Sequence, residues 1–265
     1  MKNPKITVVI PTYHRPDLLA RAIKSVQLQS FEDWECIVFS DHCPKAHLVY
    51  ENYFSDDDRI RFIENPNEWV KNVGAVGVNY ALRNSRSNII TYLCDDNIFL
   101  PNHFSSIHEA MNDETDLVQT YSYIIGINQG DGGIKAILQR GFFNDLKSTT
   151  HNKLPPNHPD MLQLAHKIDV IEKGVGFWKT VAEMEVLKEQ GHNLPVVTSN
   201  EDGEFITRLF SYIKETKTTR VKHPTCIYYC RRACVTRDEN YHNKVADLSD
   251  EETFVYPDIL KEILN

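Results

Sequence analysis

Two adjacent carboxylates close an apolar run near the middle of the chain. Residues 89–93 are mostly apolar, and Cys94, Asp95, Asp96 and Asn97 follow them directly. A buried strand that ends in two acids presents them outside the carboxyl edge of a parallel sheet, where ligands of α/β proteins bind. Carboxylate oxygens suit Mg²⁺ and Mn²⁺, which often bind phosphates at the same time. The segment therefore predicts a cation and diphosphate site, although acids at this position can also simply cap a strand and open a turn.

Three strand ends are expected to meet at this edge of the sheet. The β-branched run 6–10 predicts a first strand, which leads into a polar loop containing Thr12 and Tyr13. The run 35–39 predicts a second strand, which leads to Asp41. Strand, helix and strand within about forty residues form a right-handed βαβ unit with parallel strands. An aromatic ring, a lone carboxylate and the acid pair can therefore converge on a ligand with the outline of a nucleoside diphosphate.

The remaining patterns predict an α/β fold with a mainly parallel central sheet flanked by helices. Asp17 is placed to cap the first helix, and the Gly-rich residues 126–133 predict the turn of a hairpin. Further strands are expected at 59–64, 89–93, 117–127 and 134–138, and helices at 18–26, 73–84, 104–110, 179–188 and 204–213. Residues 144–160 read as a loop, and the chain becomes locally basic from residue 216.

Composition narrows the class of protein. The 265 residues have a formal net charge of −8, with 41% hydrophobic and 25% charged residues, which is typical of a soluble globular protein. The acidic balance argues against non-specific nucleic-acid binding, and no apolar run approaches the ~20 residues of a membrane helix. The apolar run near the start of the chain, residues 6–10, is too short for a secretory apolar segment. A cytoplasmic location is therefore expected.

The six cysteines are scattered, which favours reduced thiols. Cys226, Cys230 and Cys234 have a regular four-residue spacing, but the intervening residues 227–229 read as a strand. No Cys-x-x-Cys pair accompanies them, so a structural zinc site is disfavoured.

Several short motifs in a fixed order resemble those of the inverting family 2 glycosyltransferases of GT-A fold, including the spore-coat polysaccharide type. They are the segments 8–15, 38–41, 92–97 and 200–205, with Asn79 eighteen residues before Asn97. The resemblance implies a GT-A fold in one continuous domain, with a nucleotide-sugar-binding half at 1–115. It further implies an acceptor-binding and catalytic-base half at 116–215 and a basic tail at 216–265 that covers the site.

The resemblance also implies the ligands and the donor-binding residues. The expected donor is a UDP- or dTDP-sugar bound with Mg or Mn, and the acceptor is a carbohydrate or another hydroxyl compound. Asp96 matches the metal ligand, Asp95 lies near the ribose or donor sugar, and Asp41 accepts from the imide N–H of the base. The other residues carried over to the donor site are Pro11, Thr12, Tyr13, Arg15, Asn79 and Arg232. Cys94 departs from the family pattern because it occupies the first acidic position, where a thiol is a poor ligand for Mg or Mn.

The pair Glu201 and Asp202 resembles the catalytic acids of the family. Direct displacement with inversion requires a carboxylate near the acceptor hydroxyl, and Asp202 is expected to be that base with Glu201 as its neighbour. Both acids also precede a helical stretch, where they would stabilise the helix N-terminus. Arg231, Arg232 and His242 are candidates for a diphosphate clamp, but the histidine that often follows a Tyr-Arg pair in the family is missing here.

Two other functions compete with sugar transfer. A sugar nucleotidyltransferase would need a Gly-rich, basic loop after the first strand, and residues 11–16 contain no glycine. A non-catalytic nucleotide- or carbohydrate-binding module is compatible with Cys94, whereas Asp96 and Asp202 argue against it. The donor sugar, the acceptor, the choice between UDP and dTDP, self-association and the role of the 144–160 loop are left open.

Overall fold

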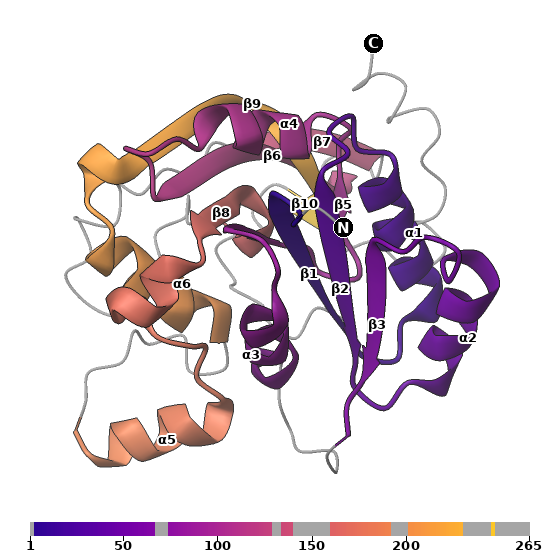
Figure 1. Cartoon of the computed structure of the whole chain (residues 1–265), viewed down its shortest axis with the longest axis horizontal. Coiled ribbons are helices and arrows are strands. Elements are labelled where there is room, and N and C mark those ends of the chain that lie inside the picture. Colours follow the sequence, from indigo (N-terminus) through magenta and orange to yellow (C-terminus); the bar gives the residue numbers. More distant parts are fainter. Residues whose placement is uncertain are drawn as a thin grey trace.

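Four parallel strands in the order β3-β2-β1-β4 form one half of the sheet. The computed structural model of the chain describes residues 3–66, 74–128, 134–139, 160–191, 201–229 and 245–246. In this half β1 pairs with β2 and β4, and β2 pairs with β3. The strands are β1 (Ile6–Thr12), β2 (Trp34–Ser40), β3 (Ile60–Glu64) and β4 (Ile89–Tyr92). All residues of β2 and β4 are buried, because helices cover both faces of the sheet (Figure 1).

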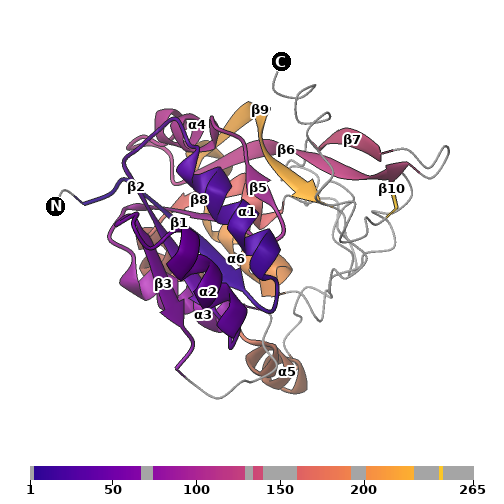
Figure 2. The ribbon, with the colours of Figure 1, turned by 90° about the vertical axis from the view of Figure 1, so that its right-hand side faces the viewer.

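The other half of the sheet is mixed, in the order β8-β6-β9-β5. β8 runs antiparallel to β4 and β6, β9 runs parallel to β6, and β5 runs antiparallel to β9. β6 and β7 form the expected hairpin, which projects from the body in Figure 2, and β10 also pairs with β6. The bounds are β5 (Ile98–Phe99), β6 (Leu117–Asn128), β7 (Ile134–Gln139), β8 (Leu164–Lys167), β9 (Thr218–Tyr229) and β10 (Val245–Ala246).

Helices lie on both faces of the sheet. α1, α2 and α4 contribute to one hydrophobic core, and α3 and α6 contribute to the other (Figure 1). The helices are α1 (Pro16–Gln27), α2 (Pro44–Tyr53), α3 (Ala75–Asn84), α4 (His103–Ala110), α5 (Val181–Glu189) and α6 (Glu201–Tyr212). Short helical turns occur at η2 (Met161–Gln163), η3 (Ile171–Val175) and η4 (Glu215–Lys217).

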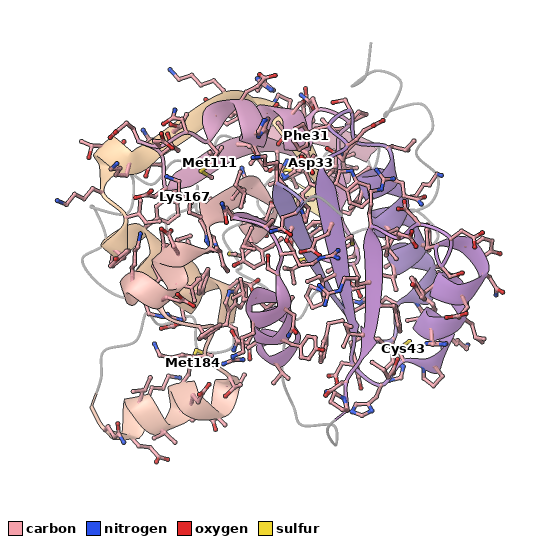
Figure 3. The ribbon with its side chains drawn as sticks, viewed as in Figure 1. Phe31, Asp33, Cys43, Met111, Lys167 and Met184 are labelled. Atoms are coloured by element: carbon pink, nitrogen blue, oxygen red, sulfur yellow. The ribbon has the colours of Figure 1, made fainter. Side chains whose placement is uncertain are left out.

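The helix α5 lies at the edge of the molecule. Thr180 caps it, since its hydroxyl accepts from the backbone N–H of Glu183 while the Glu183 carboxylate accepts from the N–H of Thr180. Met184 is its buried residue and lies on the side of the helix that faces the rest of the protein (Figure 3). Local capping therefore supports a helix that buries little apolar surface.

Most of the strands and helices expected from sequence are confirmed, with five differences. Arg15, and not Asp17, occupies the N-cap of α1, and α6 begins at Glu201. α2 was not expected, because it buries only Ala46 and has no clear apolar face. The tail was expected to begin at residue 216, but residues 218–229 form β9 within the sheet. The sheet is also less parallel than expected. Residues 144–159 and most of the chain beyond Tyr229 lie outside the described residues.

Among the described helices, none has both the length and the apolar character needed to cross a bilayer.

Candidate active site

The acid pair lies in a tight turn between β4 and β5. Leu93 donates its backbone N–H to Val9 at 3.0 Å, which continues the pairing with β1 to the start of the turn. The N–H of Asn97 bonds to the carbonyl of Cys94 at 3.1 Å and closes the turn. The Asn97 side chain accepts from the backbone N–H of Tyr229 at 2.9 Å, so the last residue of β9 holds the far side of the turn. The two acids are therefore presented at a defined position on the carboxyl edge of the parallel strands.

The exit of β1 contacts both acids. Thr12 Oγ1 donates to Asp95 Oδ2 at 2.8 Å, and the backbone N–H of Tyr13 lies 3.4 Å from the same oxygen. Arg15 Nη1 lies 3.2 Å from Asp95 Oδ1 and 2.9 Å from Asp96 Oδ2. Five of the expected donor-site residues are thus brought together by contacts between segments about eighty residues apart. Pro11 lies one residue before them, within β1.

The electrostatics of the acid turn suit a cation. Burial and the charge of Asp96 raise the pKa of Asp95 to about 6, although Arg15, Thr12 and the backbone of Tyr13 oppose this shift. One guanidinium therefore compensates the two carboxylates incompletely. Burial and the surrounding carboxylates raise the pKa of the Cys94 thiol well above its usual value, so the thiol is neutral in this structure. The donor atoms are hard carboxylate oxygens, which fit Mg²⁺ or Mn²⁺.

The described residues do not form a complete metal cage. No group of three or more His, Cys, Asp or Glu side chains in this part of the chain is arranged to hold a metal ion. Asp96, supported by Asp95, would hold a divalent ion only together with oxygen atoms from a ligand and water.

Two further acids belong to the same electrostatic cluster. Asp160 precedes η2 and caps it, with its carboxylate accepting from Leu162 N–H at 3.1 Å. Burial and the charge of Asp96 raise the pKa of Asp160 to about 6, against the hydrogen bond from Leu162. Asp202, in the first turn of α6, has its pKa raised to about 7 by burial and by the charges of Asp160 and Glu201. Asp160 thus interacts electrostatically both with Asp96 of the turn and with Asp202, the expected base.

Asp160 is a site residue that the motif comparison did not assign. Asp160 and Gln163 form a capping box, a pattern that can be read from sequence and indicates a helix start. That pattern does not indicate that η2 packs against β4, β6 and β9, which carries Asp160 to the site.

Glu201 and Asn79 bind the protein backbone in this structure. Glu201 Oε2 accepts from the N–H of Ala75 at 3.1 Å, at the first residue of α3, and its side chain is buried. A carboxylate at this place stabilises the N-terminus of α3. The Asn79 amide exchanges two hydrogen bonds with the backbone of Trp178, at 2.8 Å and 2.9 Å. The expected contact of Asn79 with the donor stays a prediction.

The exits of β1 and β2 share an unusual backbone feature. His14 and His42 have φ angles of 53° and 54°, a left-handed conformation that is uncommon for residues other than glycine. Between these exits, the Asp41 N–H donates to the Thr12 carbonyl at 2.9 Å, and Asn65 Nδ2 donates to Asp41 Oδ1 at 2.8 Å. Tyr13 is 47% exposed, so its ring is accessible for stacking. Asp41 and Tyr13 thus lie at neighbouring strand exits beside the acid turn.

Arg21 also supports the acid turn, and the motifs did not indicate it. Its Nη2 donates to the backbone carbonyl of Asp96 at 2.7 Å, and its guanidinium lies 4.1 Å from the centre of the Tyr229 ring. Arg232, the remaining expected donor-site residue, lies outside the described residues.

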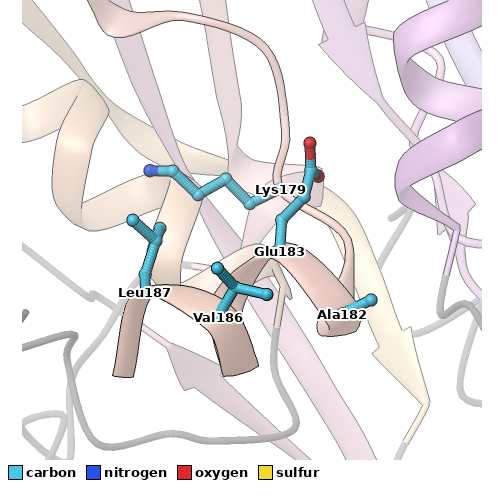
Figure 4. Close-up of a pocket in the computed structure, with 5 residues that line it drawn as sticks. All are labelled: Lys179, Ala182, Glu183, Val186 and Leu187. Carbon is cyan, nitrogen blue, oxygen red and sulfur yellow. The ribbon is translucent and has the colours of Figure 1, made fainter. Parts of the chain in front are cut away.

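A separate hollow of about 420 Å³ lies against α5. Figure 4 shows its lining residues on and just before this helix: Lys179, Ala182, Glu183, Val186 and Leu187. Lys179 also forms an ion pair with Glu204 of α6 at 2.7 Å, which joins the start of α5 to the helix that carries Asp202.

Solved structures of known proteins share the fold of this chain. S. aureus TarS 1–349, solved in complex with UDP-GlcNAc, has the same fold with a TM-score of 0.59 at 12% identity; the match covers 91% of this chain and 62% of TarS 1–349. The mannosyltransferase PcManGT from Pyrobaculum calidifontis, solved with GDP-Man and Mn²⁺, gives a TM-score of 0.56 at 14% identity, covering 88% and 59%. These likenesses confirm the GT-A type of α/β fold.

Sequence similarity identifies the family of the chain. The GalNAc(5)-diNAcBac-PP-undecaprenol beta-1,3-glucosyltransferase of Campylobacter jejuni is 35% identical over 124 residues, which cover 46% of this chain and 38% of that protein. The aligned segment thus spans about two fifths of the relative's length. Residues 7–169, more than half of the chain, match the family model for glycosyl transferase family 2. The chain therefore belongs to glycosyl transferase family 2.

Proposed function

We propose that the protein is a metal-dependent inverting glycosyltransferase that moves a sugar from a UDP- or dTDP-sugar to a hydroxyl acceptor. The observation that carries this proposal is the acid turn held by Thr12 and Arg15, together with Asp202, whose pKa is raised to about 7 by burial and by Asp160 and Glu201. A site of this kind would combine a cation-binding group with a proton acceptor. Family membership supports the reaction class, and the geometry supports the assignment of residues.

The donor half of the site is formed by the first 115 residues. Tyr13 would stack on the base, and Asp41, oriented by Asn65, would accept from the imide N–H of a pyrimidine. Thr12 and Asp95 lie where the ribose or the donor sugar would follow. Asp96 would hold Mg²⁺ or Mn²⁺, which would neutralise the charge of the departing diphosphate. Residues 116–215 would bind the acceptor and supply Asp202.

The chemical step would be a direct displacement. The acceptor oxygen attacks the anomeric carbon, and the bond from that carbon to the diphosphate oxygen breaks, with its electron pair leaving on the diphosphate. The proton of the acceptor hydroxyl passes to the Asp202 carboxylate, so no covalent enzyme intermediate forms. A carboxyl with a pKa of about 7 is a stronger base than an ordinary aspartate, and about half of it is ionised at neutral pH.

A thermal-shift experiment tests the donor half first. The wild type and Asp96→Ala would be melted with UDP, dTDP, GDP and their sugars, each with and without Mn²⁺. A Mn²⁺-dependent rise of Tm with UDP or dTDP that is lost in Asp96→Ala supports the proposal, because a ligand stabilises the state to which it binds. Asp56→Ala, which removes an exposed carboxylate, is the matched control. No shift with any nucleotide would contradict the donor site and favour a carbohydrate-binding module.

A further inference from the structure

We propose that Arg15 is an internal counter-ion of the acid turn and makes cation binding depend on the nucleoside diphosphate. This inference rests on the donor site proposed above. Arg15 Nη1 lies between Asp95 Oδ1 and Asp96 Oδ2, at 3.2 Å and 2.9 Å. A nitrogen that bridges the carboxylates of two residues occupies the place where a divalent ion would be most strongly attracted by both.

The location of Arg15 allows its side chain to move while its backbone stays fixed. Arg15 is the N-cap of α1, and its carbonyl accepts from the N–H of Leu19 at 2.9 Å. Pro16, at the first position of the helix, restricts the backbone further. The Arg15 side chain is 29% exposed, whereas those of Asp95 and Asp96 are 6% and 9% exposed. The guanidinium can therefore turn toward the open side of the site, and the two carboxylates remain in place.

The charges explain why this motion would require the nucleotide. A divalent ion that enters alone must either lie beside a guanidinium of the same sign or remove its two charge-assisted hydrogen bonds. A diphosphate changes this balance, because its oxygens ligate the metal ion and also accept two parallel bonds from an arginine. Metal ion and nucleotide would then bind as a pair, with Arg15 transferred from the carboxylates to the phosphates.

The contacts of Arg21 differ from those of Arg15, and this difference is the reason why we assign the role to Arg15. Arg21 is also near the turn, but it donates to the backbone carbonyl of Asp96 and stacks on Tyr229. It supports the turn without competing for the carboxylate oxygens.

The test measures Mn²⁺ binding without a turnover assay. Free Mn²⁺ would be followed by electron paramagnetic resonance during titration of the full chain, with and without UDP and at constant salt. In the wild type we expect UDP to raise the affinity for Mn²⁺ by about thirtyfold. In Arg15→Gln, Mn²⁺ alone should bind about tenfold more tightly than to the wild type, and the effect of UDP should fall to about threefold.

Two further variants control for charge and geometry. Arg15→Lys keeps the charge as a compact ammonium and should give an intermediate coupling. Arg59→Gln removes the same charge from an ion pair with Asp57, outside the site, and should match the wild type. Thermal melting of each variant shows whether it is folded, and Arg15→Lys carries the test if Arg15→Gln is not.

The outcomes separate this inference from the proposed function. If the wild type shows coupling between UDP and Mn²⁺ and the folded Arg15 variants show the same coupling, the role of Arg15 is wrong and the donor site stands. If UDP does not change Mn²⁺ binding to the wild type, the donor half of the proposed function fails and the inference fails with it.

Discussion

Buried acids lie at both ends of the parallel strands, Glu35 in a polar cluster at the amino end and a group of aspartates at the carboxyl end, and their pKa values shift in opposite directions. At the amino end, Glu35 of β2 is fully buried and accepts from Thr7 Oγ1 at 2.8 Å and from Arg86 N and Nε at 2.6 Å and 2.7 Å. Arg61 Nη1 adds a contact at 3.3 Å. Burial acts to raise the pKa of Glu35, but the hydrogen bonds from Arg86 and Thr7 outweigh it and the pKa is lowered.

At the carboxyl end, the same burial has the opposite net result. The pKa values of Asp95 and Asp160 are raised to about 6 and that of Asp202 to about 7, because each lies near another acid and has too few donors to offset burial. Burial alone does not distinguish a structural acid from a functional one. The distinction lies in whether the protein itself supplies the donors, and where it does not, a proton or a bound cation can supply the compensation.

The largest effect is expected at Asp202, the acid of the carboxyl end whose pKa is raised the most. Asp202→Asn keeps the size of the side chain and removes the base, so sugar transfer should fall by about 10³-fold. The affinity for UDP with Mn²⁺ should change less than about twofold, since Asp202 is proposed to act on the acceptor. Initial transfer rates and thermal shifts measure the two quantities, with Asp169→Asn as an exposed control. A variant that keeps a tenth of the activity would remove Asp202 from the role of base.

Glu35→Gln tests the amino-end cluster. The substitution leaves Arg86, Arg61 and Thr7 facing an amide, so the free energy of unfolding should fall by about 3 kcal/mol. Urea unfolding measures this change, and the UDP affinity of the folded variant should be unaltered. Glu114→Gln removes an acid that is 87% exposed and pairs with Lys217, and should cost less than about 0.5 kcal/mol. Equal effects of the two substitutions would contradict a structural role for the Glu35 cluster.

The pH dependence of stability should differ in sign between the clusters. The folded state holds the proton of Asp202 up to a pH of about 7. Protonated Asp202 therefore contributes its full stability below the ordinary aspartate pKa, and this stability is lost as the pH rises from there to about 7. Glu35, whose pKa is lowered, contributes stability above the ordinary glutamate pKa and loses it in acid. Asp202→Asn should therefore gain about 1–3 kcal/mol relative to the wild type between about pH 5 and pH 8.

Urea unfolding across that pH range provides the measurement. A slope of the opposite sign in Asp202→Asn would mean that the Asp202 carboxyl is stabilised as an anion, like Glu35.

The smallest effect is expected at Asn79, which tests whether a polar residue near the site is structural. Asn79→Ala removes two hydrogen bonds to the Trp178 backbone and should lower the free energy of unfolding by about 1–2 kcal/mol. We expect unchanged UDP affinity, with Asn52→Ala on the exposed side of α2 as control. A loss of UDP affinity greater than about fivefold would instead support the donor contact that the family resemblance implies.

The strands of the parallel half and the acid turn could be predicted from the sequence because they depend on local patterns. The run 89–93 ends one residue after β4, and Thr12 is the last residue of β1, so the contact of Thr12 with Asp95 follows from the parallel pairing of β1 and β4. The mixed half was less predictable, since antiparallel and parallel neighbours can share the same apolar pattern. α2 was missed because a helix that buries one alanine has almost no periodic signal.

The roles of individual polar residues were harder to predict. Glu201 was expected beside the catalytic base, and its carboxylate bonds to Ala75, a residue 126 positions away in the chain. Asp160 reaches the acid cluster because η2 packs on three strands. The neighbouring sequence does not indicate either contact, because each depends on how distant elements pack.

The sequence by itself determined the α/β class, the strand ends and the acids that follow them, because burial and turn preferences act over a few residues. Only the tertiary structure decided that Glu35 is compensated by Thr7 and Arg86 while Asp202 is not. The physical reason is that the free energy of a buried charge depends on donors and charges within a few ångströms, and folding draws these groups from distant parts of the chain.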